Sequence, residues 1–149
     1  MPHYFRNFTK LLRKNSPIQN PNFDAKLILE DGSQFPVHRV ILAANSEFFQ
    51  GLFTHEWNHE YWIGGVPKKA MKLILDHFYC QELSHQLTEE EHLDLIIWAD
   101  YFAAPAILKT CMDFLLRKGF SSQLLEFSRQ HHLRSLEERL LRLRQVLPE

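Results

Sequence analysis

The sequence predicts an α+β fold that is mostly helical. One short β-hairpin pattern lies in the first third of the chain, and amphipathic helical patterns fill most of the remaining two thirds. The length of 149 residues suits a single domain with a small appendage, because a chain of this size can bury a sizeable core. We divide it into an N-terminal helix with a linker (residues 1–22), a central domain (23–120) and a C-terminal helix pair (121–149).

Composition narrows the class of protein. The net charge of −1 gives no electrostatic reason to expect a nucleic acid partner. Cys80 and Cys111 each lie in an apolar, helix-like stretch, which indicates buried thiols in a reducing compartment rather than a disulfide framework or a thiol metal site. The apolar runs are too short to span a bilayer, and no secretory signal follows Met1. We therefore expect a cytoplasmic or nuclear protein that does not contact membranes.

The first 22 residues combine positive charge with an apolar stripe. They contain four basic residues and no acidic one: Arg6, Lys10, Arg13 and Lys14. Their large apolar side chains share one face of a helix predicted over residues 3–14: Phe5, Phe8, Leu11 and Leu12. A mitochondrial presequence has the same character. We favour instead a docking helix that packs against a partner subunit or its own domain, followed by a breaker-rich connection at residues 15–22.

A β-hairpin is predicted next. Residues 23–30 alternate in polarity and end at Asp31-Gly32, a strong turn signal, and residues 34–38 form the returning strand. Pro36 has no N–H to donate to a strand ladder, so the returning strand should lie at a sheet edge or contain a bulge.

The pattern then becomes helical. Residues 40–44 predict a short helix, and Ser46 is placed to cap a second one. Residues 61–63 predict a brief strand, and Pro67 suits the first turn of a helix that runs to about Cys80.

Paired helices are predicted to complete the central domain. Thr88 and Glu91 form a capping box that opens one helix. Pro105 starts the next, which should stop near Gly119. The sum is a small sheet followed by helices that pack in pairs.

The segment FDAKLILEDGSQFPVHRVILAANSEFFQGLF, residues 23–53, resembles the opening of a BTB/POZ domain. In that family a strand that begins with Asp pairs with one that ends in aromatic-x-small-His-Lys/Arg, and a V-L-A-A-x-S-x-x-F helix comes next. The matching positions here are Asp24, Phe35, Val37, His38, Arg39, Ile41, Leu42, Ala43, Ala44, Ser46 and Phe49. Residues 66–79 and 98–101 are similar to later helices of the family in the same order, so the resemblance covers roughly residues 3–120. It implies a small sheet flanked by helical hairpins.

Two further helices are predicted at the C-terminus. Ser121 or Ser122 can cap the first, and Ser135 with Glu138 forms a capping box for the second. Residues 121–147 resemble the helix pair that often follows a BTB domain, known as the three-box or the start of a BACK domain.

Residues 55–59 spell HEWNH, a literal zinc-protease H-E-x-x-H pattern. It falls where a short predicted helix turns toward a strand, so the two histidines need not share a helix face. The extended form of the motif also fails, because Trp62 stands where its glycine belongs. No Gly-rich phosphate loop, paired-cysteine spacing or nucleophile elbow occurs. We therefore predict no catalytic site, metal or cofactor, and a protein that is not an enzyme.

The resemblance implies a homodimer formed by the N-terminal helix and the sheet edge. Burial of Phe5, Phe8, Leu11 and Leu12 would supply the free energy of association. Each fully buried large apolar side chain contributes about 1.5–3 kcal/mol. In BTB dimers the residues at the positions of Asp24 and Arg39 face one another near the subunit interface. A local ion pair that helps to hold the hairpin is the alternative interpretation of this pair.

The resemblance also implies a partner. Many BTB proteins recruit cullin-3 as substrate adaptors of a ubiquitin ligase, through a hydrophobic-x-Glu triplet after the second helix and the tips of later helices. The matching triplet here is Trp57-Asn58-His59, in which His59 departs from the usual Glu and Glu60 follows directly. The residues expected to contact cullin-3 are Trp57, Glu60, Tyr101 and Phe102. A further, unknown substrate protein is expected. The alternatives are a corepressor platform and a regulator that pairs with other BTB proteins.

Overall fold

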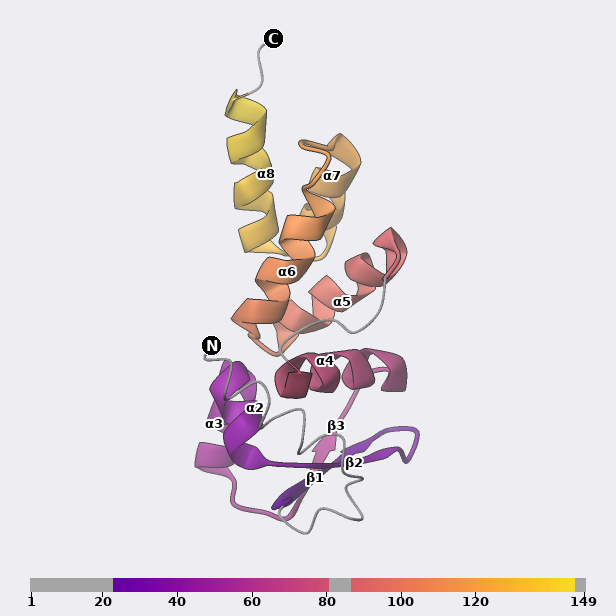
Figure 1. Cartoon of the computed structure of the whole chain (residues 1–149), viewed down its shortest axis with the longest axis vertical. Helices are drawn as coiled ribbons and strands as arrows, with labels where there is room; N and C mark the ends of the chain where they lie inside the picture. Colours follow the sequence, from indigo (N-terminus) through magenta and orange to yellow (C-terminus); the bar gives the residue numbers. More distant parts are fainter. Residues whose placement is uncertain (1–22, 81–86, 147–149) are drawn as a thin grey trace.

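The computed structural model of the chain describes residues 23–80 and 87–146, and Figure 1 shows their arrangement. Within these residues a three-stranded sheet is combined with seven helices, so the predicted α+β, mostly helical fold class is confirmed. The elements in chain order are β1 (Ala25–Leu29), β2 (Gln34–Val37), α2 (Arg39–Asn45), α3 (Glu47–His55), β3 (Glu60–Ile63), α4 (Lys68–Cys80), α5 (Glu89–Tyr101), α6 (Pro105–Leu115), α7 (Ser122–Gln130) and α8 (Arg134–Val146). The helix and linker predicted over residues 1–22 lie outside the described residues.

β1 and β2 form the predicted hairpin. They are antiparallel, with Lys26 of β1 paired with Pro36 of β2. Gly32 in the turn has a φ of 87°, a left-handed conformation that glycine adopts without steric cost. The N–H of Gly32 donates to the carbonyl of Leu29 at 3.0 Å. β2 lies at the edge of the sheet, as the proline predicted, because an edge strand tolerates a missing N–H donor.

β3 lies on the other side of β1 and runs parallel to it, with Leu27 paired with Tyr61. A parallel pair needs a crossover connection, and α2 and α3 supply it. Alternation along β3 places Tyr61 and Ile63 in the core and leaves Trp62 74% exposed. The sheet therefore has one face packed against helices and one face that carries a large aromatic side chain.

The helices continue the structure away from the sheet (Figure 1). α4 lies between the sheet and the α5–α6 pair, and α7 and α8 lie at the far end. Because α4 packs on both sides, most of its apolar residues are fully buried: Met71, Ile74, Leu75 and Phe78. The sheet and the helices share one continuous apolar core.

Phe49 of α3 lies at the centre of an aromatic cluster. Its ring stacks on Phe102 with centroids 5.2 Å apart and on Phe53 at 5.7 Å. It also meets the ring of Phe78 edge-on at 6.5 Å. Aromatic pairs of this kind each add about 0.5–1.5 kcal/mol beyond the area they bury. The cluster ties α3 to α4 and to the end of α5.

Helix caps agree with most of the predictions from local sequence. The Ser46 hydroxyl accepts from the N–H of Phe49 at 3.1 Å and caps α3. Thr88 and Glu91 form the predicted capping box of α5, and Ser121 caps α7. Each such cap is worth about 1 kcal/mol, because it satisfies an N–H that the helix leaves without a partner.

The predicted capping box of Ser135 and Glu138 is wrong. α8 begins at Arg134, so Ser135 lies inside its first turn. The carbonyl of Leu133 accepts from the N–H of Glu137 at 3.0 Å, and its own N–H donates to the carbonyl of Ser128 at 2.8 Å. Leu133 is buried, and its docking against α7 starts the helix earlier than the local pattern predicts.

Candidate partner-binding surface

Residues 56–59 form a loop that joins α3 to β3. α3 ends at His55, and Glu56 already has an extended backbone, with φ −127° and ψ 119°. At the other end, the carbonyl of His59 accepts from the backbone N–H of Lys26 in β1 at 2.8 Å. The two histidines of the H-E-x-x-H pattern therefore lie on different elements. No group of three His, Cys, Asp or Glu side chains that could hold a metal ion occurs in residues 23–80 and 87–146.

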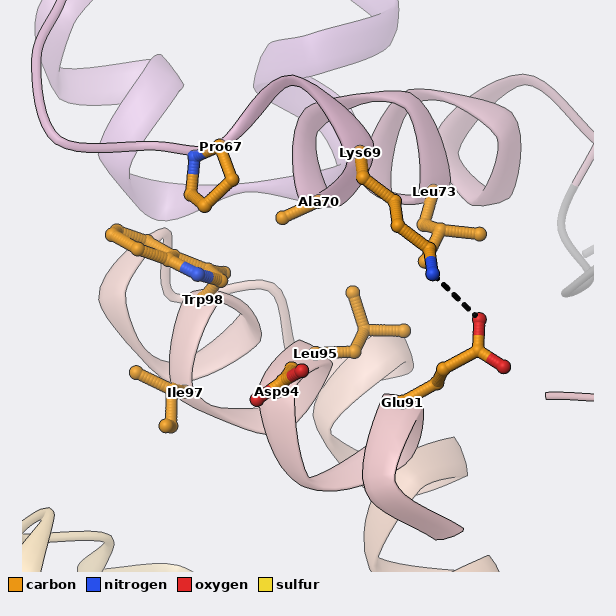
Figure 2. Close-up of a pocket in the computed structure, with 9 residues that line it drawn as sticks. All are labelled: Pro67, Lys69, Ala70, Leu73, Glu91, Asp94, Leu95, Ile97 and Trp98. Carbon is orange, nitrogen blue, oxygen red and sulfur yellow. Dashed lines mark ion pairs between the residues drawn. The ribbon is translucent and has the colours of Figure 1, made fainter. Parts of the chain in front are cut away.

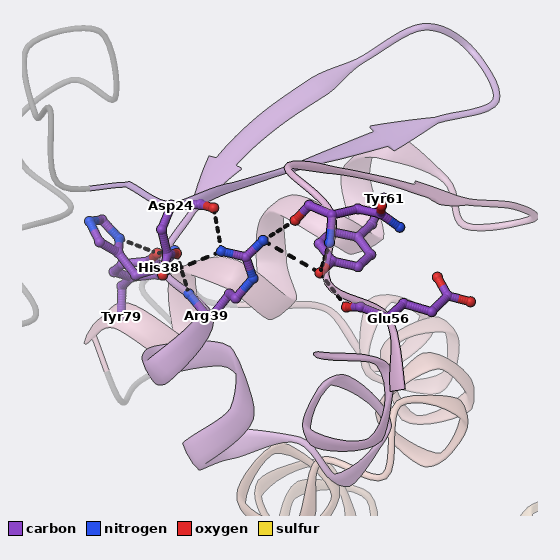
Figure 3. A network of polar contacts seen from close by, with 7 residues as sticks. Asp24, His38, Arg39, Glu56, Tyr61 and Tyr79 are labelled. Atoms are coloured by element: carbon purple, nitrogen blue, oxygen red, sulfur yellow. Dashed lines mark hydrogen bonds and ion pairs between the residues drawn. The ribbon is translucent and has the colours of Figure 1, made fainter. Parts of the chain in front are cut away.

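The Tyr61 hydroxyl forms hydrogen bonds to the backbone of this loop. It donates to the carbonyl of Glu56 at 2.7 Å and accepts from the N–H of Asn58 at 3.0 Å (Figure 3). One phenol oxygen thus bonds the backbone on both sides of Trp57. Because Tyr61 is itself buried in β3, the loop is tied to the core.

Arg39, the first residue of α2, lies at the centre of the polar network in Figure 3. Its guanidinium donates through Nη1 to the carbonyl of Asp24 at 2.6 Å and lies 3.6 Å from the Oδ2 of that residue. Through Nη2 it donates to the carbonyl of Asn58 and to the Tyr61 hydroxyl, the latter at 3.5 Å. Arg39 is only 7% exposed, so these contacts compensate the burial of a charge.

The Asp24–Arg39 pair is therefore formed within one chain. Asp24 Oδ1 also accepts from the backbone N–H of Arg39 at 2.8 Å, at the start of α2. This contact is a local ion pair, the alternative that the sequence left open, and it joins the start of β1 to α2. A role for the same pair across a subunit interface stays a prediction.

His38 and Tyr79 extend the network on its other side. The Tyr79 hydroxyl accepts from the backbone N–H of His38 at 2.9 Å and lies 2.8 Å from its Nδ1. Burial lowers the pKa of His38, and the charge of Asp24 opposes this shift only in part. The imidazole is therefore held mainly in its neutral form at neutral pH.

Trp57 is presented to solvent by the loop and is 75% exposed. The Arg39 guanidinium carbon lies 4.3 Å from the centroid of its ring, within the range of a cation–π contact. The same guanidinium also faces the rings of Phe53 and Tyr61, at 5.9 and 5.7 Å. One side of the indole is thus held in place, while most of its surface is available for a partner.

Glu60 and His59 follow Trp57 and are both exposed. Glu60 is the first residue of β3, so alternation places its side chain on the outer face of the sheet with Trp62. Trp62 was not among the predicted contact residues. The apolar–polar alternation of residues 60–63 was the signal that could have marked it as an outward-facing aromatic.

Tyr101 and Phe102, at the end of α5, have different environments. Tyr101 is 52% exposed, and its ring lies 5.4 Å from that of Phe48 in the first turn of α3. Phe102 is fully buried in the aromatic cluster, so its side chain offers no surface to a partner. Trp57 and Tyr101 lie beyond opposite ends of α3, whose nine residues span about 13 Å.

A shallow groove of about 420 Å³ opens beside Trp57. It is lined by Phe23, Asp24, Ala25, Lys26, Arg39, Trp57, His59 and Glu60. Both signs of charge are present, and the described lining residues include no nucleophile with an adjacent base. The one fully buried thiol in the described part of the chain, Cys111, lies elsewhere, and burial raises its pKa to about 12. An exposed tryptophan beside an arginine is a feature of surfaces that contact proteins.

Comparison with known proteins identifies what this arrangement is similar to. A family model of the BTB/POZ domain matches residues 14–119. Kelch-like protein 40 of Xenopus tropicalis is 30% identical over 105 residues, which cover 68% of this chain and 17% of that protein. Zinc finger and BTB domain-containing protein 7A of Gallus gallus is 29% identical over 120 residues, which cover 74% of this chain and 22% of that protein. The solved BTB domain of human Gigaxonin is 26% identical, with a TM-score of 0.61, and the match covers 74% of this chain and 92% of that one.

The chain spans about a fifth of the length of these two curated relatives. The helix pair α7–α8 lies beyond the residues that the family model matches. In the part of the chain that the structure describes, no helix has both the length and the apolar character needed to cross a membrane.

Proposed function

Because the chain belongs to the BTB/POZ domain family of protein-interaction modules, we propose that it is a homodimeric adaptor that recruits cullin-3 and presents a substrate protein to the ubiquitin ligase. The observation that carries this proposal is the exposed indole of Trp57 on a loop whose backbone is bonded to Arg39 and Tyr61. Large aromatic side chains dominate the binding energy of many protein interfaces.

Trp57 has the properties of an anchor residue. It occupies the hydrophobic position of the triplet that other BTB proteins use to contact cullin-3. Burial of a large apolar side chain contributes about 1.5–3 kcal/mol to association. The loop is already ordered by hydrogen bonds at Glu56 and Asn58, so little conformational entropy has to be lost on binding.

His59 is the departure from the expected triplet, and we propose that it weakens the interaction. The carbonyl of His59 accepts from the N–H of Lys26 in β1, and Glu60 follows as the first residue of β3. Glu60 then offers its carboxylate from the first position of the strand. Replacing His59 by Glu should strengthen cullin-3 binding, whereas Glu60→Gln should weaken it.

The homodimer is proposed from the family and from residues outside the described part of the chain. The apolar stripe of Phe5, Phe8, Leu11 and Leu12 would supply the buried surface. Light scattering should give twice the mass of one chain, and Phe8→Asp with Leu12→Asp should yield a monomer. A wild-type chain that stays monomeric at high concentration would remove this part of the proposal.

A second candidate function is a scaffold outside the ligase system, as a corepressor platform or a pairing regulator of other BTB proteins. Two observations favour it. In the triplet that the family resemblance assigns to residues 57–59, His59 replaces the usual Glu. One relative is a zinc finger and BTB domain-containing protein, a different class from the Kelch-like one.

The decisive experiment is a calorimetric titration of the cullin-3 N-terminal domain into the full chain. Trp57→Ala should weaken binding by about 2 kcal/mol, or about 30-fold in Kd. Trp62→Ala is the matched control, because it removes an equally exposed indole that lies beyond the triplet. It should change Kd by no more than about threefold.

Each outcome separates the two candidates. Saturable binding that only Trp57→Ala weakens supports the adaptor. Equal losses in the two variants would mean that Trp57 is not the anchor. A folded dimer that does not bind the cullin-3 domain favours the scaffold.

A further inference from the structure

An open groove of about 320 Å³ lies between α4 and α5, and Figure 2 shows it in close-up. Among the described residues, it shares no lining residue with the groove beside Trp57. Six of the described residues that line it are apolar: Pro67, Ala70, Leu73, Leu95, Ile97 and Trp98. The volume lies at the lower end of the range of about 300–1,000 Å³ that ligand sites occupy.

The two ends of this α4–α5 groove differ. Pro67 and Trp98 face one another at one end, and an ion pair between Lys69 and Glu91 closes the other (Figure 2). The Lys69 Nζ lies 3.3 Å from a carboxylate oxygen of Glu91, and the lysine side chain is 75% exposed. An ion pair this exposed contributes little to stability, so an incoming charged group can displace it.

The charges around the groove favour a cationic occupant. Lys69 is the one cation among the described residues that line the groove, and Glu91 neutralises it. Asp94 stands exposed in the α5 wall, and no hydrogen bond or ion pair in the described residues engages its carboxylate. α5 adds Glu89 and Glu90 in its first turn and contains no lysine or arginine. The other lysines of α4 lie outside the lining.

We propose that the α4–α5 groove binds a segment of a partner protein that carries bulky aliphatic side chains next to arginine. The aliphatic side chains would lie on Ala70, Leu73 and Leu95, where they lose contact with water. The arginine would pair with Asp94 and lie against the ring of Trp98, a favourable cation–π partner. The described residues that line this groove do not include Trp57 or Glu60, and the ring of Trp98 packs edge-on against Tyr101 at 5.7 Å.

The test uses two short helical peptides as probes, titrated into the full chain. Both carry two leucines one helical turn apart. One peptide has arginines beside the leucines, and the other has glutamates at the same positions. Binding is followed by the NMR signal of the Trp98 indole N–H. The arginine peptide should bind at least about tenfold more tightly than the glutamate peptide, and high salt should reduce the difference.

Charge-reversal variants locate the site. Asp94→Lys should weaken binding of the arginine peptide about tenfold or more and should favour the glutamate peptide. Glu126→Lys is the matched control, because it makes the same charge change at an exposed position on α7. It should leave both affinities unchanged. Neither position is buried, so both variants should fold.

Three results would overturn the proposal. The first is no saturable shift of the Trp98 signal with either peptide. The second is equal binding of the two peptides, and the third is an Asp94→Lys chain that binds the arginine peptide like the wild type. Because cullin-3 is absent from this experiment, its outcome does not depend on whether the adaptor proposal holds.

Discussion

The two ends of α3 are held by different interactions. At its start, Phe49 stacks on Phe102, and the Ser46 hydroxyl donates to the carbonyl of Phe102 at 2.6 Å. Beyond its end, Arg39 and Tyr61 hold residues 56–59 through hydrogen bonds to the backbone. Phe49 and Phe102 are fully buried at the first end, whereas residues 56–59 at the second end are exposed to solvent.

The two ends of α3 therefore contribute differently. Packing at the first end stabilises the fold, and hydrogen bonds at the second end position Trp57. The free energy of aromatic packing depends on the apolar area that the rings bury, and small shifts of the rings change it little. Hydrogen bonds add less net stability, but their geometry defines where each backbone atom lies. The end that carries Trp57 uses the second kind, so we expect its variants to affect partner binding more than folding.

The largest effect is expected from Phe102→Ala. Loss of a buried phenylalanine costs about 3–5 kcal/mol, because it removes apolar contact and leaves a cavity. Chemical denaturation measures the free energy of unfolding. Tyr101→Ala, at the exposed neighbouring position, should cost less than about 1 kcal/mol. A similar small loss for Phe102→Ala would contradict its central place in the aromatic cluster.

Arg39→Ala should have the next largest effect, a loss of about 2 kcal/mol in unfolding free energy, since it removes charged hydrogen bonds to Asp24 and Asn58. It should also free the Trp57 ring, which a changed indole fluorescence would report. Arg39→Lys is the matched control, because it keeps the charge but cannot bond both segments. If Arg39→Ala unfolds the chain, the lysine variant still tests the order of Trp57.

Tyr61→Phe isolates the polar contribution at the same end of α3. The ring and its packing remain, and the bonds to Glu56 and Asn58 are lost. We expect a loss of about 1–2 kcal/mol in stability and faster hydrogen exchange of the Asn58 amide. An unchanged exchange rate there would show that the hydroxyl does not order the loop.

The smallest expected effect is a dependence of stability on pH. Burial lowers the pKa of His38 and His77 below that of an unfolded histidine, so the unfolded state binds protons more readily. The folded state keeps the full stability associated with these two histidines above about pH 6.5. This stability is lost as the pH falls through their folded-state pKa values. Thermal unfolding at pH 7.5 and 5.5 measures this loss.

His77→Asn should reduce the difference in melting temperature between these two pH values, since it removes one of the buried imidazoles. A chain that is more stable at pH 5.5 than at pH 7.5 would contradict the assignment.

Local features of the structure could be predicted from short stretches of sequence. The hairpin at Gly32, the edge position of Pro36 and the caps at Ser46 and Thr88 each depend on residues a few positions apart. The capping box predicted at Ser135 is wrong because the start of that helix depends on a tertiary contact. There a buried side chain, Leu133, decides where the helix begins.

The four residues expected to contact cullin-3 lie in different environments. Trp57, Glu60 and Tyr101 are exposed, and their contact with a partner stays a prediction. Phe102 follows Tyr101 directly, yet it turns into the core because α5 ends there and its ring meets Phe49 from a distant segment. Tyr101 and Phe102 are both aromatic but differ in environment, and a local sequence pattern cannot distinguish the exposed residue from the buried one.

The sequence by itself determined the fold class, the order of the elements, most of the helix starts and the likeness to BTB/POZ domains. Periodicity, capping and turn chemistry act over a few residues, and the sequence displays them directly. The tertiary structure alone decided that β3 runs parallel to β1 and that Arg39 and Tyr61 hold the Trp57 loop. It also decided that a groove with an acidic wall opens between α4 and α5. These features join segments that are distant in the chain, and their energies exist only once the core has brought those segments together.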